Sequence, residues 1–233
     1  MSRRQILVDF YWTRDKDPRV PLGHASLLAA LAGEPAVDVQ SVAIPVNTNT
    51  RSAEDVAREL LRETVGLPAT EVDIAFGAYV WGEEFLGSVL RLLRAGGFAG
   101  RIVLGGPQIS YGSQNLEALY PEADAFVRGY GEDALRRLAA SSSKQDIPGV
   151  HWAQTKDIQH QATVNLETLK SPWLTGTIPL EGQSFIRWET QRGCTYRCTF
   201  CQHREPGERL VRKGLSLPRV EAEIGRASCR ERV

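Results

Sequence analysis

The sequence predicts an α/β protein in which a parallel sheet is covered by helices on both faces, followed by the opening of a second unit. Short apolar runs of strand length alternate with segments of helical periodicity from residue 5 to about residue 140. The apolar share of 42% and the charged share of 24% are typical of a globular chain with a real core. Three of the four cysteines fall within eight residues, which indicates a metal or cluster site rather than a disulfide framework.

Each element of the first unit is predicted from its local pattern. One helix begins at Ser52, with Asp55 in the place of the usual capping-box glutamate, and another ends at Gly96-Gly97. Five strands that alternate with helices predict a doubly wound, flavodoxin-like (Rossmann-like) sheet of order 2-1-3-4-5, with a ligand at the carboxyl ends of the strands. The predicted strands are residues 5–12, 37–46, 72–80, 101–104 and 123–128, and further helices cover residues 25–31, 85–93 and 134–138.

The composition changes after this predicted sheet domain, which we place at residues 1–140. Residues 141–183 begin with a serine-rich linker signal and continue with a proline-containing connection. Within them, the pattern of residues 150–164 is compatible with a small hairpin. The segment is therefore interpreted as a linker between two units.

A second unit opens with a predicted strand over residues 184–189 that runs into the cysteine loop. Ser216 and Pro218 then predict the start of a helix. The order strand, loop, helix is that of a βα unit. We interpret residues 184–223 as the opening of another βα-built domain, of which only this opening is present.

The last ten residues, 224–233, match what a common short-read sequencing adaptor encodes in one reading frame. A polar, basic tail is the alternative interpretation, but a match over ten codons is hard to obtain by chance. We therefore expect natural sequence to stop near Glu223, inside a domain, and Cys229 not to be a native residue. Segments of this origin are left out of fold reasoning.

The overall charge excludes some classes of partner. The formal net charge is zero, which argues against nucleic acid or an anionic membrane surface as the main partner. No apolar run approaches the roughly 20 residues that a membrane span needs. The N-terminus leads into a strand without a signal-peptide core or cleavage site. We expect a cytoplasmic protein that binds neither nucleic acid nor membranes.

Cys194, Cys198 and Cys201 have the spacing C-x3-C-x2-C. A four-iron cluster normally takes four thiolates, so three on one loop leave one iron open to another ligand. Gly193 allows the backbone to bend tightly before the first cysteine. The alternatives are buried structural thiols or a zinc site with His203 as fourth ligand, but zinc sites favour C-x2-C pairs with a second half-site. The spacing therefore favours an iron–sulfur cluster.

With this motif, the chain resembles the radical SAM superfamily, and more narrowly its branch with an N-terminal cobalamin-binding domain. The likeness is carried by the cysteine spacing, by residues 171–176 (SPWLTG) and 188–194 (WETQRGC), and by the loops 105–108 (GGPQ) and 127–132 (VRGYGE). It covers essentially the whole natural part of the chain. The unit from residue 184 would then open a truncated, partial TIM barrel.

The resemblance implies a set of cofactors and the residues that bind them. The three cysteines would hold a [4Fe–4S] cluster, whose open iron binds S-adenosylmethionine, with Phe200 beside the adenine and Tyr196 among the cofactor contacts. Cobalamin would lie at the carboxyl edge of the first domain. Its contacts would be Tyr79, Trp81, Gly82, Gly105, Gly106, Pro107, Gly129, Gly131 and Glu132.

Two interpretations of the glycines among these residues stay open from spacing alone. A flat corrin needs a shelf without side chains, but tight βα turns use glycine for their own geometry as well. Many cobalamin proteins also place an axial histidine in the pattern D-x-H-x-x-G, and none of the four histidines of this chain lies in it. His24 comes nearest, with Leu22 and Leu27 in place of the Asp and Gly. We interpret His24 as a helix-start or loop residue.

The resemblance implies reductive cleavage of S-adenosylmethionine at the cluster and methyl transfer to an unactivated carbon or phosphorus of a small-molecule or peptide natural product. A flavodoxin- or ferredoxin-type electron donor is implied as well. Cyclisation or rearrangement, or a non-catalytic cobalamin- or zinc-binding module, are the alternatives. A methylthiotransferase would carry a second cluster in its first domain, and no cysteine precedes Cys194. We expect the chain as it stands, without the later barrel strands, to be inactive.

Overall fold

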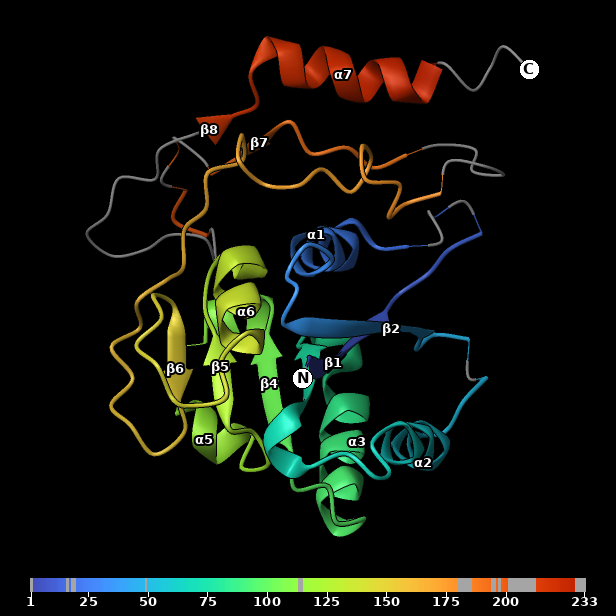
Figure 1. Cartoon of the computed structure of the whole chain (residues 1–233), viewed down its shortest axis with the longest axis vertical. Coiled ribbons are helices and arrows are strands. Elements are labelled where there is room, and N and C mark those ends of the chain that lie inside the picture. The colour runs from blue at the N-terminus through green and yellow to red at the C-terminus, as the bar shows by residue number, and fades with distance from the viewer. Residues whose placement is uncertain are drawn as a thin grey trace.

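In a computed structural model of the chain, the described residues are 2–15, 17, 20–48, 50–112, 115–179, 186–193, 196, 198–200 and 213–228. They contain a six-stranded sheet of order β2-β1-β3-β4-β5-β6 with helices on both faces (Figure 1). The first five of these strands run parallel, and β6 pairs antiparallel with β5. The strands are β1 (Arg3–Tyr11), β2 (Val37–Pro45), β3 (Val72–Gly77), β4 (Arg101–Gly105), β5 (Ala125–Val127) and β6 (Val150–Trp152).

The predicted α/β class and the order of the parallel strands are confirmed, but the predicted number of five strands was wrong. Val150 pairs with Val127, so β6 extends the sheet beyond β5. Ala162 forms a parallel bridge with Gly129, and residues 150–164 therefore do not make a hairpin of their own. The segment pairs here because the outer edge of β5 carries backbone N–H and C=O groups that need hydrogen-bond partners. The domain boundary predicted at residue 140 falls before the last strand of the sheet.

The long helices of the sheet domain lie in two layers (Figure 1). α1 (Leu22–Leu31) and α6 (Gly131–Ala139) cover one face, and α2 (Ala53–Glu63) and α3 (Glu83–Ala95) cover the other. Alternate residues of each central strand pack into the two layers, as expected when both faces of a parallel sheet are buried. Within the described ranges, none of the helices has the length and apolar character needed to cross a bilayer. The shorter helices are η1 (Ala69–Glu71), η2 (Val80–Gly82), α4 (Pro107–Ser110) and α5 (Leu116–Leu119).

Local signals for the helix ends are confirmed. The Ser52 hydroxyl accepts a hydrogen bond from the backbone N–H of Asp55 at 3.1 Å, so Ser52 is the N-cap of α2. α3 ends at Ala95, Gly96 is its C-cap, and Gly97 adopts a φ of 86°. These ends need only a few consecutive residues, which is why the sequence predicts them well.

Beyond the sheet domain, the described residues form a second, two-stranded sheet and a helix. β7 (Gln191–Arg192) pairs antiparallel with β8 (Lys213–Gly214), and α7 (Leu217–Ser228) follows, as Ser216 and Pro218 predicted. Residues 186–190 carry no strand, and the rest of the strand predicted over residues 184–189 lies outside the described residues. A barrel-type βα opening and a non-native origin of the last ten residues therefore stay predictions.

Candidate functional site

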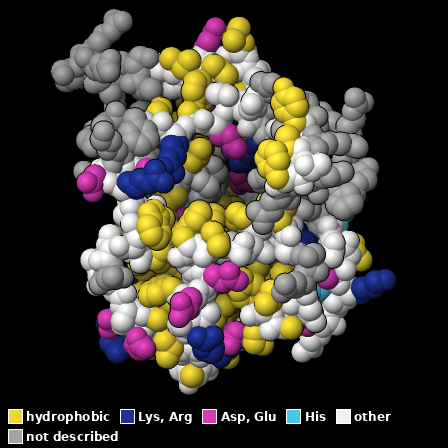
Figure 2. Space-filling model, turned by 180° about the vertical axis from the view of Figure 1, so that it is seen from behind, with side chains coloured by type: hydrophobic (Ala, Val, Ile, Leu, Met, Phe, Trp, Pro, Cys, Tyr) yellow, Lys and Arg dark blue, Asp and Glu magenta, His cyan; other side chains and the backbone are white. Residues whose placement is uncertain are grey.

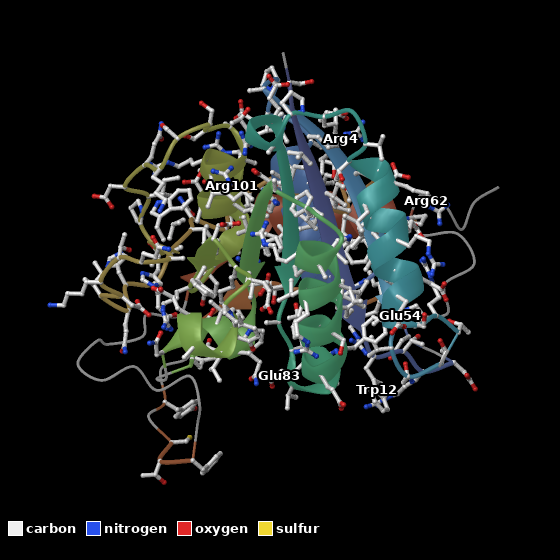
Figure 3. All side chains as sticks on the ribbon, turned by 90° about the horizontal axis from the view of Figure 1, so that it is seen from below. Arg4, Trp12, Glu54, Arg62, Glu83 and Arg101 are labelled. Atoms are coloured by element: carbon white, nitrogen blue, oxygen red, sulfur yellow. The ribbon has the colours of Figure 1, made fainter. Side chains whose placement is uncertain are left out.

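The carboxyl ends of the parallel strands meet at one edge of the sheet. Figure 3 shows Arg4 and Arg101 near the strand starts at one end of the domain, and Trp12 and Glu83 at the opposite end. A cavity of about 320 Å³ lies at this carboxyl edge, where this fold class binds its ligands. Its walls come from β1, β3, β4 and β5, from the first turns of α1 and α6, and from two residues near the cysteine loop.

Most of the residues that the sequence places at this edge line the cavity. They are Tyr79, Gly105, Gly106, Gly129, Gly131 and Glu132.

Three residues predicted as cobalamin contacts are absent from the walls of the cavity. Trp81 donates its indole N–H to the carbonyl of Phe10 at 3.0 Å, and its ring stacks on Tyr79 with 4.7 Å between centroids. Gly82 is buried against Phe10, and Pro107 is the first residue of α4. Trp81 therefore supports the ring of Tyr79 from behind.

The glycines of the two loops divide into two kinds. Gly106 has a φ of 94°, and a Cβ there would lie 2.9 Å from the carbonyl oxygen of Ala78. Gly129 has a φ of 81°, and its Cβ would meet Ala162. The backbone itself requires glycine at these two positions. At Gly105, by contrast, a Cβ would meet no atom of the described residues closer than 3.7 Å, apart from its chain neighbours, so packing leaves room for a side chain. The absence of a side chain at Gly105 therefore leaves space in the cavity wall that neither the backbone conformation nor the packing requires.

This difference gives a matched pair of variants. Gly105→Ala is expected to leave stability unchanged or raise it by roughly 0.5–1 kcal/mol, because alanine is favoured over glycine in a strand. The same variant narrows the cavity, so it should weaken binding of the cobalamin that the sequence predicts roughly tenfold, a typical overpacking cost. Gly106→Ala should lower the free energy of unfolding by more than about 1 kcal/mol, because its φ is positive. Urea unfolding and a hydroxocobalamin titration measure both effects. Equal stability loss in the two variants would contradict the assignment.

Asp9 lines the cavity from the carboxyl half of β1, and it was not among the residues predicted at this edge. The residue is only 4% exposed, and its Oδ1 has no hydrogen-bond partner among the described residues. Burial raises the pKa of Asp9 to about 7. Burial, together with the nearby Asp9 carboxyl, also raises the pKa of Tyr79. A signal was present in the sequence, since Asp9 interrupts an apolar strand (ILVDFY).

His24 lies in the first turn of α1, as the sequence analysis interpreted it, and it also lines the cavity. Its Nε2 lies 2.8 Å from the hydroxyl oxygen of Ser41 on β2. Burial lowers the pKa of His24 to about 4, so the imidazole is neutral at physiological pH. The cavity therefore gains a neutral polar group rather than a cation.

Arg192 closes the cavity from the side of the cysteine loop, two residues before Cys194. Its guanidinium donates to Glu132 Oε1 at 2.6 Å and to Glu189 Oε2 at 2.9 Å, and lies 4.9 Å from the ring centroid of Tyr130. Burial opposes the charge of Arg192, but these hydrogen bonds outweigh it and raise its pKa. A buried ion pair thus joins the approach to the cysteine loop to the start of α6.

The hollow formed in this way is visible on the rear of the molecule. Figure 2 shows hydrophobic side chains around it and acidic and basic side chains inside it. Glu132 has one oxygen on Arg192, while its Oε2 is buried without a hydrogen-bond partner in the described part of the chain. An apolar wall with a few polar groups is the usual composition of a small-molecule site.

The cysteine loop itself is described only in part. Cys198 is exposed, while Cys194 and Cys201 lie outside the described residues. Tyr196 and Phe200 are exposed, Phe200 at 91%, and neither lines the cavity. Among the described side chains, no group of three or more His, Cys, Asp or Glu is placed to hold a metal ion. The cluster therefore stays a prediction from the cysteine spacing.

The fold and the cavity define the class of domain: an α/β, Rossmann-like domain with a cavity at the carboxyl edge of its sheet. Two curated proteins are similar to it. The 2-(S-pantetheinyl)-carbapenam-3-carboxylate methyltransferase of Streptantibioticus cattleyicolor is 30% identical over 151 residues, which are 57% of this chain and 22% of the relative. The cobalamin-dependent radical SAM methyltransferase TokK of Streptomyces tokunonensis is 31% identical over 145 residues, which are 55% of this chain and 21% of the relative.

The chain thus spans about a fifth of the length of these curated relatives. No protein-family model matches it. Both relatives are named as methyltransferases, and the second also as a cobalamin-dependent radical SAM enzyme.

Proposed function

We propose that this chain forms the cobalamin-binding domain and the opening of the radical SAM domain of a cobalamin-dependent radical SAM methyltransferase. The observation that carries the proposal is the cavity at the carboxyl edge, lined by residues of both glycine loops. The likeness to two methyltransferases at about 30% identity supports the same class. The three-cysteine spacing supports a [4Fe–4S] cluster with one open iron for S-adenosylmethionine.

The residues at the cavity fit a portion of cobalamin. The volume of about 320 Å³ lies at the lower end of the roughly 300–1,000 Å³ of small-molecule sites, so one part of so large a cofactor would enter it. Buried oxygens of Asp9 and Glu132 without partners among the described residues are open to hydrogen bonds from a ligand. Gly105 leaves its stretch of wall without a side chain.

When bound, cobalamin would supply the methyl group, and the cluster with S-adenosylmethionine would supply the radical chemistry. The task of this chain is to bind, orient and shield. Apolar walls from both strands and helices would shield the bound part of the ligand from water, and Tyr79, held by Trp81, would present a rigid ring to it. Arg192 fixes the approach to the cysteine loop against Glu132. The apolar lining residues are Leu7, Val8, Leu22, Leu27, Ala75, Val103, Val127 and Leu135.

The proposed substrate is a small-molecule or peptide natural product. The name of the Streptantibioticus relative, which acts on a carbapenam carboxylate, supports a small molecule. We propose methyl transfer to an unactivated carbon or phosphorus, with electrons from a flavodoxin- or ferredoxin-type donor. Activity would require the part of the protein that these relatives have beyond the matched region.

The cluster is tested by anaerobic reconstitution with iron and sulfide, without cobalamin. The wild type and Cys229→Ala should each bind about four irons per chain and show the electron paramagnetic resonance signal of a reduced [4Fe–4S] cluster. Cys194→Ala, Cys198→Ala and Cys201→Ala should each lose most of this iron, because each removes one of the three proposed ligands. Equal loss in Cys229→Ala, or tight binding of one zinc in place of iron, would contradict the cluster.

A further inference from the structure

Asp9 is the feature of the cavity that its surroundings leave unexplained. It is almost fully buried, and its Oδ1 has no hydrogen-bond partner among the described residues. Asp9 lies near the backbone of Gly77, where an added Cβ would be 3.6 Å from Oδ1, and near the ring of Tyr79. A buried polar atom without a partner costs free energy, so its presence in a ligand-sized cavity needs a compensating interaction.

The charge state of Asp9 decides which ligand group it can pair with. A buried carboxylate needs a cation, and Arg192, the one cation among the described lining residues, is already held by Glu132 and Glu189. A neutral carboxylic acid needs no cation and offers one O–H donor and one carbonyl acceptor. The geometry around Asp9 therefore favours the neutral acid.

We propose that Asp9, as the neutral acid, forms a two-point hydrogen-bonded pair with a primary carboxamide of the bound cofactor. The acid O–H would donate to the amide carbonyl, and the acid carbonyl would accept from the amide N–H. A corrin carries carboxamides of this kind on its periphery, so the inference rests on the proposed cobalamin function and names a residue that selects the amidated cofactor.

Other ionisable groups face Asp9 or the cavity, and four of them have pKa values that are shifted away from neutral pH. Burial lowers the pKa of His24 to about 4, so it stays neutral above pH 6. Burial raises the pKa of both nearby tyrosines, and Arg192 stays charged because its pKa is raised. Burial raises the pKa of Asp9 to about 7, which places its titration in an accessible range. The groups in question are Tyr11, His24, Tyr79, Glu132, Glu189 and Arg192.

The test is a titration of the full chain with hydroxocobalamin at pH 6 and pH 8.5, followed by visible absorption after removal of free cofactor. Wild-type affinity should fall roughly 10- to 30-fold at pH 8.5, because about 3% of Asp9 keeps its proton 1.5 units above a pKa of about 7. Asp9→Asn keeps a donor and an acceptor, so its affinity should be the same at both pH values. Asp9→Leu should lose roughly 5- to 10-fold at pH 6, as expected for lost hydrogen bonds.

A second readout needs no cofactor. The native pKa of Asp9 lies above its unfolded value of 3.8, so the fold binds more protons than the unfolded chain between these values. The contribution of Asp9 to stability should therefore be complete below about pH 4 and lost as pH rises through about 7. Urea unfolding of the wild type should show this decline. The difference between the wild type and Asp9→Asn should follow the same pH window.

The outcomes separate the two proposals. If the wild type retains cobalamin at neither pH, the proposed function and the role of Asp9 both fail. If it retains cobalamin but Asp9→Asn shows the same pH profile, or if wild-type affinity rises with pH, only the role of Asp9 is overturned. A flat profile for Asp9→Asn together with a falling one for the wild type supports the proposal.

Discussion

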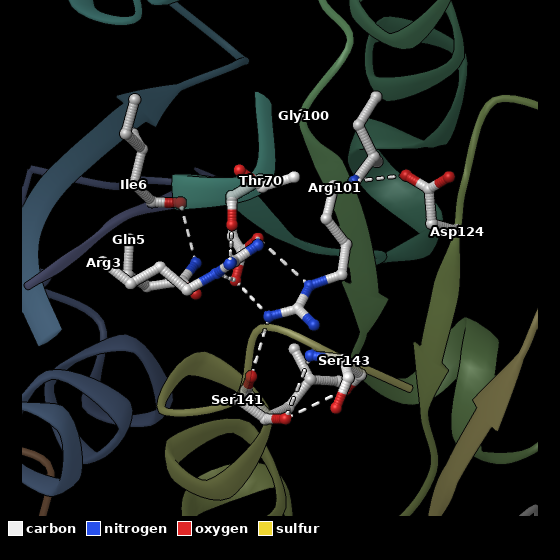
Figure 4. Close-up of polar contacts among 12 residues, drawn as sticks. Arg3, Gln5, Ile6, Thr70, Gly100, Arg101, Asp124, Ser141 and Ser143 are labelled. Carbon is white, nitrogen blue, oxygen red and sulfur yellow. Dashed lines mark hydrogen bonds and ion pairs between the residues drawn. The ribbon is translucent and has the colours of Figure 1, made fainter. Parts of the chain in front are cut away.

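Replacing Asp73 by asparagine is expected to lower the free energy of unfolding by about 3–5 kcal/mol, the usual cost of leaving buried charges without a counterion. Asp73 is fully buried near the start of β3, between Arg3 of β1 and Arg101 of β4. Arg3 Nε donates to Oδ2 at 2.9 Å, and Arg101 Nε donates to Oδ1 at 3.0 Å. Figure 4 shows the side chains of Arg3 and Arg101 converging from β1 and β4, the two strands that flank β3.

The size of this effect follows from the surroundings of the two arginines. Both are largely buried, and Arg101 also donates to the carbonyl of Leu138 at 2.7 Å, which ties the end of α6 to the sheet. Asparagine keeps the shape of the side chain but removes the charge that both guanidinium groups share. A loss of this size would be a large fraction of the roughly 5–15 kcal/mol of a typical domain.

Asp38→Asn is the matched control for this measurement. Asp38 pairs with Arg4 at 3.0 Å at the same end of the sheet, but the side chains are 52% and 32% exposed. An exposed pair contributes about 0–1 kcal/mol, so the control should unfold close to the wild type. Urea unfolding of the three proteins at pH 7 makes the comparison. Equal midpoints for Asp38→Asn and Asp73→Asn would show that the buried cluster does not hold the sheet together.

Arg192→Met is expected to detach the approach to the cysteine loop from the sheet domain. The substitution leaves Glu132 buried without its cation. Breaking such a pair costs about 3–5 kcal/mol, which would weaken the attachment of residues 186–193 to the sheet domain by that amount. Methionine retains the apolar stem that packs near Tyr130 but not the cation above its ring. The sheet has its own core, so the loss should appear as local opening rather than global unfolding.

Hydrogen exchange resolves this prediction by segment. Amides of residues 186–193 and of the first turn of α6 should lose protection, while those of β3 and β4 keep theirs. Arg136→Met is the control, because Arg136 pairs with Glu34 and Asp133 at a more exposed position on the same helix. Global loss of protection in Arg192→Met, or unchanged protection at residues 186–193, would contradict a role for the pair in holding this segment.

Much of the fold was predictable because its signals are local. The apolar runs, the Ser52 cap and the Gly96-Gly97 stop each depend on a few consecutive residues, and the structure confirms them. β6 was not predicted as a strand of the sheet, because a strand of three residues shows little alternation of apolar and polar residues. Its pairing with β5 is also a long-range contact. The sequence predicted a possible hairpin over residues 150–164, but it did not indicate that β5 is the partner of β6.

The candidate site was likewise predictable only in part. The fold class predicts that ligands bind past the fourth and fifth strands, and the glycines there line the cavity. Asp9 is a single polar residue in an apolar run, and nothing in that run shows that its carboxyl lacks a partner. Arg192 and Glu132 are sixty residues apart, and only the fold brings them to 2.6 Å.

The sequence by itself determined the order of the parallel strands, the helix ends, the edge of the sheet at which the cavity lies and the cysteine spacing that predicts the cluster. These features follow from residue type and short-range spacing, which are properties of the sequence itself and do not depend on contacts between distant segments. The tertiary structure decided that Trp81 supports Tyr79 rather than lining the cavity, that Gly106 serves the backbone, and that Asp9 is buried without a cation. Burial and charge pairing arise between distant segments, so they exist only once the chain is folded.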